Sequence, residues 1–193
     1  MTPASVPGRL DIEPMALPGV LKLVPRVFGD HRGFFLESYN AGLFADAGLP
    51  TEWVQDNHSR SQRGVLRGIH YQLVQPQGKL VRVTRGAVFD VAVDLRRSSP
   101  TFGQWVGTEL SDENQTMMWV PPGFGHGFLT LSDVADFCYK CTTLWHKPSD
   151  RSLRWDDPDL AIAWPLDRLG GEAPTLARKD AAAPLLAGAE VFA

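Results

Sequence analysis

The chain has 193 residues, of which 44% are hydrophobic and 21% are charged, and this is the ordinary balance of a globular domain with its own core. The formal net charge of −3 excludes the overall basic field of a nucleic-acid-binding protein, and no apolar run approaches the roughly 20 residues of a membrane span. The N-terminus lacks the charged and apolar regions of a signal peptide, so a cytoplasmic protein is expected.

Residues 1–17 are rich in proline and predict a poorly ordered tail that leads into a strand at 20–24. A second strand is predicted at 34–39. Asn40 is expected to cap a short helix that ends at Gly48, because asparagine favours the first position of a helix and glycine its end.

From Trp53 onward the chain shows the short apolar pattern of β-strands. The clearest is 87–95, where Phe, Val, Val and Leu alternate with Asp, Ala and Asp. It follows the strand 79–83 across a turn at 84–86, and this spacing predicts a hairpin. Further strands are predicted at 53–58, 64–72, 104–110, 117–120, 127–131 and 136–145. Many short strands at close spacing predict an all-β sandwich, jelly roll or barrel.

No linker or internal repeat divides the chain, so we predict a single domain over residues 1–193. Its body would run over 18–165, and a C-terminal segment over 166–193 would carry Asp180. The Ala- and Leu-rich stretch at 177–187 predicts a short peripheral helix.

Cys138 and Cys141 form a C-x-x-C spacing inside an expected strand. A redox pair of this kind normally opens a helix near a βαβ unit, and one pair cannot complete a structural zinc site. In a regular strand the two thiols would point to opposite faces. A redox or metal role is therefore not expected.

The segment 64–72 carries Arg67 and His70 on either side of Gly68. His70 alone could be a half-buried structural histidine, or it could be a base, because imidazole exchanges protons near neutral pH. Arg67 lies three positions earlier, which means the opposite face in a regular strand. A bulge at Gly68 would turn both side chains to one face, where Arg67 could hold an anion.

Three further residues each have a structural and a chemical interpretation. Lys79 is either a solvated strand end or a cation that projects into the same space as His70. Tyr139 is either a core tyrosine or a general acid. Asp180 either caps a helix or accepts the second ring N–H of His70, as carboxylates do in acid–base dyads.

The segment 120–128 contains the pattern P-x-G-x-x-H, which resembles the second motif of the cupin superfamily of small jelly rolls. A cupin metal site would also need an H-x-H pair and a carboxylate, but no second histidine accompanies His70. Fewer than three protein ligands hold a metal only weakly. The motif therefore favours a double-stranded β-helix, the cupin-like jelly roll, without a metal.

An ordered series of strings between residues 18 and 186 resembles the dTDP-4-dehydrorhamnose 3,5-epimerase family. The strings are Gln55–Ser59, Gly64–Gln72, Gln77–Val83, Asp90–Arg96, Ser99–Gly103, Pro122–Phe128, Tyr139–Cys141, Trp155–Pro158 and Lys179–Asp180. The resemblance implies a jelly-roll homodimer with short peripheral helices that needs no metal or coenzyme.

The resemblance also implies roles for individual residues. His70 would be the base, Asp180 its dyad partner, Tyr139 the acid and Lys79 a cation at the reacting centre. The implied substrate contacts are Arg32, Glu37, Gln55, Asp56, Asn57, Arg67, Lys79, His126 and Lys179, with Asp150 in the place of an acidic contact. The substrate would be dTDP-4-dehydro-6-deoxy-D-glucose, inverted at C3 and C5 to give dTDP-4-dehydro-L-rhamnose.

The residue types fit this chemistry on their own terms. Inversion of a carbon beside a ketone needs a base on one face of the sugar and an acid on the other. Negative charge collects on the ketone oxygen between the two steps, and cations such as Arg67 and Lys79 would stabilise it. Because one ketone activates both C3 and C5, one base could serve both carbons.

Three positions depart from the family pattern. Trp145 stands where a tyrosine usually stacks on the thymine, and its larger face should preserve the stacking. The turn between His70 and Lys79 is one residue shorter than expected, which questions the reach of Lys79. Ala177 stands where a serine usually caps the segment before Asp180.

Three alternatives stay open at this point. A single-carbon epimerase acting on a related dTDP-4-keto-6-deoxysugar would use the same residues. A metal-dependent cupin oxygenase would contain iron or another transition metal. A sugar-binding jelly roll without catalysis would not require His70, Tyr139 and Asp180 together.

Overall fold

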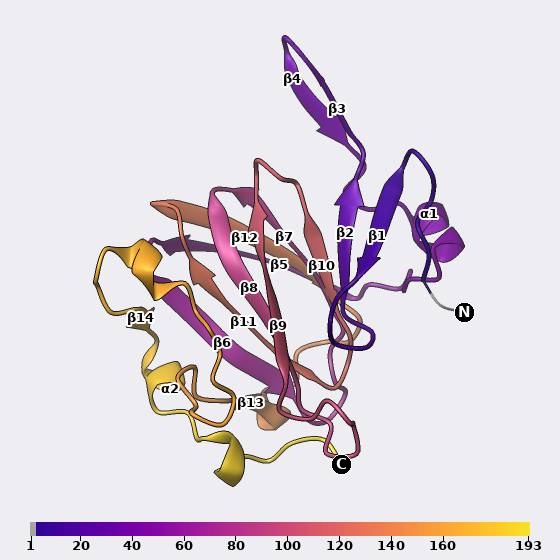
Figure 1. Cartoon of the computed structure of the whole chain (residues 1–193). Coiled ribbons are helices and arrows are strands. Elements are labelled where there is room, and N and C mark those ends of the chain that lie inside the picture. The colour runs from indigo at the N-terminus through magenta and orange to yellow at the C-terminus, as the bar shows by residue number, and fades with distance from the viewer. Residues whose placement is uncertain (1–2) are drawn as a thin grey trace.

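Two β-sheets pack face to face in the computed structural model, which describes residues 3–193; residues 1 and 2 of the predicted tail lie outside the described residues (Figure 1). The first sheet contains, in spatial order, β1 (Leu10–Pro14), β2 (Leu21–Pro25), β10 (Met117–Val120), β7 (Lys79–Arg85), β12 (Val134–Cys141) and β5 (Gln55–Gln62). The second contains β13 (Asp150–Ser152), β6 (Val65–Gln72), β11 (Phe124–Thr130), β8 (Ala87–Asp94) and β9 (Trp105–Ser111), with β14 (Thr175–Leu176) paired to β6.

The remaining elements are peripheral. The strands β3 (Val27–Asp30) and β4 (Gly33–Leu36) form a hairpin that projects away from the two sheets (Figure 1). The helices are α1 (Ala41–Asp46) and α2 (Arg178–Ala181), and the 3-10 turns are η1 (Lys147–Ser149), η2 (Leu166–Leu169) and η3 (Leu186–Gly188). The predicted all-β jelly roll with short peripheral helices is therefore confirmed.

Strand alternation produces this stacking, as β8 shows. Val88 and Ala92 belong to the apolar cluster between the sheets, whereas Val91 and Val93 belong to a cluster on the outer side of the second sheet. The central cluster also contains Phe128 from β11 and neighbours from β7, β10 and β12. Successive side chains of a strand point to opposite faces, so one strand serves two cores.

The chain after β13 covers the outer side of the second sheet. Its apolar side chains there include Leu153, Leu160 and Trp164, with Leu169 from the C-terminal segment. On the other side of the molecule, helix α1 covers the outer face of the first sheet through Leu43 and Phe44. As predicted, α1 starts after Asn40, whose side-chain oxygen accepts a hydrogen bond from the Leu43 amide at 3.1 Å.

The predicted poorly ordered tail over 1–17 is wrong for residues 10–14, which form β1 and pair antiparallel with β2. Leu10 and Ile12 alternate with acidic residues and are buried in the cluster around α1. The surrounding prolines hide this short period of two. Pro14 is tolerated because β1 is an edge strand, where a missing amide leaves no neighbour unpaired.

The predicted hairpin between 79–83 and 87–95 is wrong as well. β7 pairs with β10 and β12 in the first sheet, whereas β8 pairs with β9 and β11 in the second. Gly86 turns the chain between the sheets with a φ of +75°, and a Cβ there would lie 2.1 Å from the Val134 carbonyl oxygen. A short turn with glycine can join two strands of one sheet or lead from one sheet to the other. Only the long-range pairing of the strands shows which of the two occurs.

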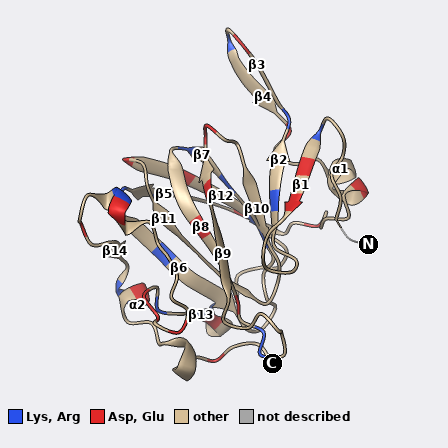
Figure 2. Ribbon diagram, in the orientation of Figure 1, with Lys and Arg blue, Asp and Glu red and all other residues tan. Residues whose placement is uncertain are grey.

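Charged residues lie mostly at strand ends, in loops and at the tip of the projecting hairpin, but a few occupy the middle of strands in the second sheet (Figure 2). Among residues 3–193, none of the helices has the length and apolar character that crossing a membrane requires. The charged positions inside the jelly roll are therefore the exceptions that need a functional account.

Phe137 is the side chain on which the central cluster should depend most. It is 1% exposed and stacks on Phe128 with 4.2 Å between ring centroids. Replacing it with alanine should lower the free energy of unfolding by about 3–5 kcal/mol, because the change removes a buried ring and leaves a space between the sheets. Urea unfolding followed by circular dichroism measures this, and Phe137→Leu is the matched control with a smaller loss. Equal losses for both variants would contradict this assignment.

Candidate active site

An irregularity in β6 brings Arg67 and His70 to the same face of the second sheet. Opposite Arg67 lies Phe128 and opposite His70 lies His126, so three steps along β6 match two along β11. On the other face, Leu66 and Ile69 both belong to the outer apolar cluster although they too are three positions apart. The sequence-based condition for a shared site, a bulge near Gly68, is therefore met.

Gly68 permits this bulge because of two local features. Its φ is +110°, which disfavours any side chain. A Cβ there would also lie 2.6 Å from both the Gly127 Cα and the His126 carbonyl oxygen on β11. Gly127 in turn has no room for a side chain, since its Cβ would lie 2.8 Å from the Arg67 carbonyl oxygen. The two glycines let the backbones of β6 and β11 approach at the bulge.

His70 and Asp180 form a hydrogen-bonded pair, with 2.6 Å between His70 Nε2 and Asp180 Oδ1. The His70 side chain is 34% exposed, whereas that of Asp180 is 2% exposed. Burial raises the pKa of Asp180, but the hydrogen bonds from His70 and from the Gly68 amide outweigh it and hold that pKa below its usual value. Asp180 is therefore an ionised, buried partner, and Nδ1 is the ring nitrogen left for a substrate.

Asp180 reaches His70 from a segment far along the chain. It lies on α2, directly after β14, which pairs in parallel with the start of β6. Ala177 precedes α2 without any side-chain cap, as the sequence suggested. After α2, the Leu186 amide donates a hydrogen bond to Asp157 Oδ2 at 2.6 Å. Contacts on both sides of α2 thus hold the carboxylate against the imidazole.

Tyr139 belongs to the first sheet, whereas His70 belongs to the second. Tyr139 lies on β12 next to Val81 of β7, and both side chains pack with the cluster between the sheets. Burial raises the pKa of Tyr139, and Arg67 is the nearby cation that opposes this rise. The phenol is therefore protonated at neutral pH.

Lys79 lies inside the jelly roll, 8% exposed, and its Nζ donates to the His70 carbonyl oxygen at 3.5 Å. The short turn before β7 therefore does not withdraw Lys79 from the site. Burial lowers the pKa of Lys79, and nearby acidic groups including Asp90 and Asp150 oppose that effect.

Asp90 is a site residue that the sequence reasoning missed. It is fully buried on the inner face of β8, and both its carboxylate oxygens lie 3.0 Å from His126 Nε2. His126 itself is 7% exposed and is the direct cross-strand neighbour of His70. The alternation in the sequence put Asp90 on the more polar face of this strand, and only the packing of the two sheets shows that this face is buried. Ser61, whose Oγ accepts from Arg67 Nε at 3.0 Å, offered no signal in the sequence.

Several predicted contacts line the edge of this space. Gln55 and Asn57 lie on the inner side of β5, where the Gln55 amide donates to Asn57 Oδ1 at 3.0 Å. Gln55 also accepts from the Trp145 amide at 2.8 Å, and the Trp145 side chain is 54% exposed. Lys179 and Asp150 form an ion pair at 2.5 Å beside α2.

Three predicted contacts do not reach the site within one chain. Asp56 points to the other face of β5, because its neighbours on the strand point inward, and it pairs with Lys140 at 3.0 Å. Arg32 lies in the projecting hairpin and pairs with Asp30 at 2.6 Å. Glu37 follows β4 and pairs with Arg9.

The two cysteine thiols are not joined in a disulfide. Cys138 and Cys141 are both free, and they point to opposite faces of β12, toward Thr84 and Asn57 respectively. Residues 3–193 contain no group of three His, Cys, Asp or Glu side chains placed to hold a metal ion. The structure instead brings together a hydrogen-bonded His70–Asp180 pair, a buried Lys79 and a partly buried Tyr139 in the jelly roll.

The chain resembles characterised proteins over most of its length. A family model described as dTDP-4-dehydrorhamnose 3,5-epimerase matches residues 14–188. The dTDP-4-dehydrorhamnose 3,5-epimerase of Pseudomonas aeruginosa is 58% identical over 179 residues, which is 92% of this chain and 97% of that protein. The enzyme of the same description from Salmonella typhimurium is 54% identical over 173 residues, or 89% and 92% of the two chains.

A solved structure agrees in fold. The dTDP-6-deoxy-D-glucose-3,5-epimerase of Legionella pneumophila, solved in complex with dTDP-4-keto-L-rhamnose, superposes with a TM-score of 0.89 at 51% identity. The superposition covers 94% of this chain and 95% of that chain. Fold and sequence similarity thus extend across the jelly roll and the segment that carries Asp180.

Gly68→Ala tests the bulge. The added Cβ collides with the β11 backbone and strains φ, so Arg67 and His70 should no longer share a face, and turnover should fall by about 100-fold or more. Gly170→Ala is the matched control, since Gly170 also has a positive φ (+70°) but open space around it, and it should lose only about 1 kcal/mol of stability. Steady-state rates and urea unfolding measure the two effects. Full activity in Gly68→Ala would refute the role of the bulge.

Proposed function

The chain belongs to the dTDP-4-dehydrorhamnose 3,5-epimerase family, isomerases that invert C3 and C5 of a dTDP-linked 4-keto-6-deoxyhexose, and we propose that His70, Asp180 and Tyr139 carry its proton transfers. The observation that carries the proposal is the 2.6 Å contact between His70 Nε2 and Asp180 Oδ1, with His70 on the sheet opposite to the one that carries Tyr139. The reaction converts dTDP-4-dehydro-6-deoxy-D-glucose to dTDP-4-dehydro-L-rhamnose.

In the first step His70 Nδ1 removes the proton from the carbon beside the C4 ketone. The ring becomes an imidazolium, which the ionised Asp180 stabilises through Nε2. Because Asp180 is buried and its pKa is held low, it orients the ring without competing for the proton. The electron pair of the broken C–H bond moves into the ring and gives an enolate.

The enolate carries its negative charge on the C4 oxygen. Lys79 is the buried cation on the inner face closest to His70, since its Nζ contacts the His70 carbonyl oxygen. Arg67 shares the face of His70 and is held by Ser61. Cations fixed in place before the reaction stabilise such a charge more than water does, because they need no reorganisation.

In the second step the Tyr139 hydroxyl delivers a proton to the opposite face of the carbon, and the configuration is inverted. Burial keeps the phenol protonated until this moment, and the phenolate left behind is stabilised by Arg67 nearby. Afterwards His70 releases its proton to solvent and Tyr139 regains one. The same ketone activates both C3 and C5, so the cycle runs at each carbon in turn.

Trp145 and the edge residues bind the nucleotide in this proposal. The exposed Trp145 ring provides a flat face on which the thymine stacks, and its backbone is fixed by Gln55. Asn57 on β5 and Lys179 on α2 would add a hydrogen bond and a positive charge for the sugar diphosphate. The two free thiols, Cys138 and Cys141, also fit the reducing cytoplasm as the location.

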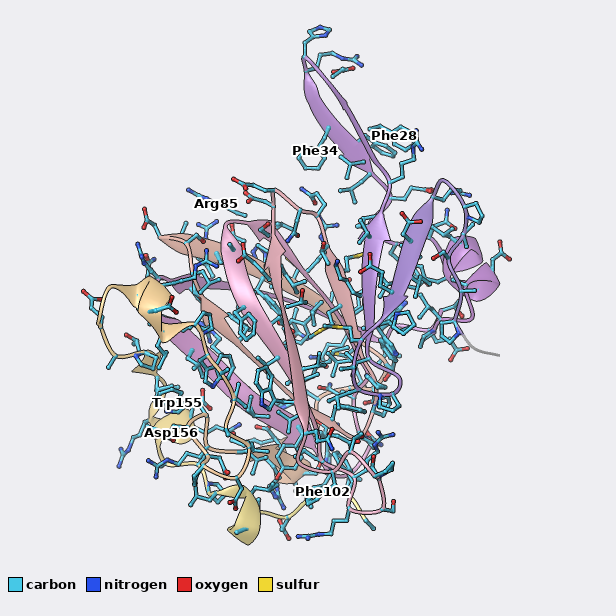
Figure 3. The ribbon with its side chains drawn as sticks, in the orientation of Figure 1. Phe28, Phe34, Arg85, Phe102, Trp155 and Asp156 are labelled. Atoms are coloured by element: carbon cyan, nitrogen blue, oxygen red, sulfur yellow. The ribbon has the colours of Figure 1, made fainter. Side chains whose placement is uncertain are left out.

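A homodimer accounts for the residues that do not reach the site. The projecting hairpin exposes Phe28, Phe34 and Phe35 by 54%, 60% and 65%, and Figure 3 shows Phe28 and Phe34 standing clear of both sheets. An apolar patch of this kind marks an interaction surface. If the hairpin packs on a second copy, Arg32 would complete the site of the partner subunit.

Tyr139→Phe in D₂O separates the two proton transfers. His70 should still remove the proton and return deuterium to the same face, so the substrate should gain deuterium without inversion. NMR of the sugar locates the label and the configuration at C3 and C5. His70→Ala should stop both exchange and inversion. Inversion by Tyr139→Phe at the rate of the unchanged enzyme would refute the mechanism. Label at only one carbon with the unchanged enzyme would refute the double inversion.

Subunit mixing tests the dimer. A chain with His70→Ala and a chain with Arg32→Ala, each inactive alone, should regain about a quarter of full activity when refolded together, because half of the dimers are mixed and each contains one intact site. The matched control mixes His70→Ala with Tyr139→Phe, two changes within the site of one chain, and should regain none. Activity in neither mixture would count against a shared site.

A further inference from the structure

Gln72 is a buried polar side chain that the proton transfers do not use. It is 3% exposed and lies at the end of β6, two positions after His70. Its Nε2 donates to the Gln75 carbonyl oxygen at 2.7 Å and to the Leu144 carbonyl oxygen at 3.1 Å. Its Oε1 accepts from the His146 amide at 2.7 Å. Both hydrogens and the oxygen of this amide are therefore used, and the side chain is held in one orientation.

Two of these bonds lie on either side of Trp145. Residues 142–146 (the Trp145 loop) connect β12 to η1 and belong to no strand, so their backbone groups need other partners. The Leu144 carbonyl precedes Trp145 and the His146 amide follows it, and Gln72 binds both. The Trp145 side chain itself is 54% exposed. A buried side chain thus fixes the backbone from which an exposed ring projects.

A second glutamine holds the same peptide group from the other sheet. The Leu144 carbonyl and the Trp145 amide belong to one peptide group, and Gln55 Oε1 accepts from that amide at 2.8 Å. Gln55 lies on β5 of the first sheet, whereas Gln72 lies on β6 of the second. The Trp145 loop is therefore attached to both sheets at the residue that carries the exposed ring.

The Trp145 loop is also bound to the turn that precedes β7. The Gln75 carbonyl oxygen, which accepts from Gln72, accepts as well from the Thr143 hydroxyl at 2.8 Å. Gln77 Nε2 donates to the Thr143 carbonyl oxygen at 2.9 Å. These two bonds reach the loop at residue 143, two positions before the ring. The bonds of Gln72 reach the residues directly next to it.

A ring that is already in place binds a base at a lower cost in conformational freedom. If the loop were free, its backbone would have to be ordered each time a nucleotide bound, and part of the stacking energy would be lost. Within residues 3–193, no hydrogen bond joins the Gln72 side chain to the side chains of His70, Asp180 or Tyr139. The contribution of Gln72 therefore belongs to binding and not to proton transfer.

We propose that Gln72 is a positioning residue of the nucleotide site, which holds Trp145 in place before the nucleotide binds. The proposal rests on the function proposed above, because it takes the Trp145 ring as the face on which the base of a nucleoside diphosphate stacks. Gln72 acts through the backbone of the Trp145 loop and does not touch the substrate.

Gln72→Met removes the three hydrogen bonds and keeps a side chain of similar length. The Kd of dTDP, measured by isothermal titration calorimetry, should rise by about tenfold, because two bonds to the Trp145 loop are lost. KM should rise by a similar factor, whereas kcat should change by less than about threefold. An unchanged Kd, or a fall in kcat with KM unchanged, overturns the proposal.

Gln115→Met is the matched control. Gln115 is also buried, at 7% exposed, and its Nε2 donates to the Asp112 carbonyl oxygen at 2.6 Å in the turn between β9 and β10. Its replacement should lower the stability and leave the Kd of dTDP as it is. In a Trp145→Ala background, Gln72→Met should no longer weaken dTDP binding, because the ring that it positions is absent. Equal weakening with and without Trp145 overturns the proposal.

Fluorine NMR reports on Trp145 without any nucleotide or turnover. When 5-fluorotryptophan replaces the six tryptophans, the resonance that disappears in Trp145→Phe is that of Trp145. Gln72→Met should move this resonance toward that of the free amino acid and leave the others in place, and Gln115→Met should not move it. A Trp145 resonance that stays in place overturns the proposal.

Gln72→Glu takes the place of Gln72→Met if the latter does not fold. It keeps an acceptor for the His146 amide but has no hydrogen for the Leu144 carbonyl, and the same movement or constancy of the Trp145 resonance supports or overturns the proposal. Deuterium exchange at C3 and C5 by the unchanged chain tests the reaction separately. The role of Gln72 and the epimerase mechanism can therefore fail independently.

Discussion

The close approach of two glycines, Gly68 on β6 and Gly127 on β11, is the constraint on which the site depends. A regular strand alternates its side chains, so Arg67 and His70 would stand on opposite faces. The bulge adds one residue to β6 and brings both to the inner face, while Leu66 and Ile69 keep the outer face apolar. Without it, either His70 or Arg67 would point into the outer core.

The same geometry explains how charged groups can occupy the centre of a jelly roll. The inner face of the second sheet carries His70, His126 and Asp90 on three adjacent strands. The inner face of the first sheet carries Lys79 and Tyr139. Each charge has a partner of opposite sign or a hydrogen bond, as buried polar groups require.

Much of the fold followed from local patterns in the sequence, whereas most of the site residues came from the resemblance to a known family. The alternation of residues 87–95 predicted the strand and its two faces. The spacing around Gly68 indicated that Arg67 and His70 could share a face only if the strand bulged there. The hairpin prediction at 84–86 failed because a turn does not reveal which sheet the next strand joins. Asp56 was grouped with its neighbours Gln55 and Asn57 as a contact, although strand alternation turns it to the other face.

Asp180 shows why a long-range contact lies beyond local reasoning. It sits 110 positions after His70, and its place depends on contacts on both sides of α2. Before α2, β14 pairs with the start of β6. After α2, the Leu186 amide binds Asp157, and the Tyr71 hydroxyl donates to the Glu190 carbonyl oxygen at 2.5 Å.

These contacts link catalysis to packing. Tyr71 belongs to the same strand as His70 and to the outer apolar cluster that the C-terminal segment covers. The Asp180 carboxylate that bonds His70 is therefore held by the burial that stabilises the second sheet. Any loosening of that outer cluster lets α2 withdraw and leaves the imidazole without its partner, so the dyad lasts only as long as the C-terminal segment stays packed.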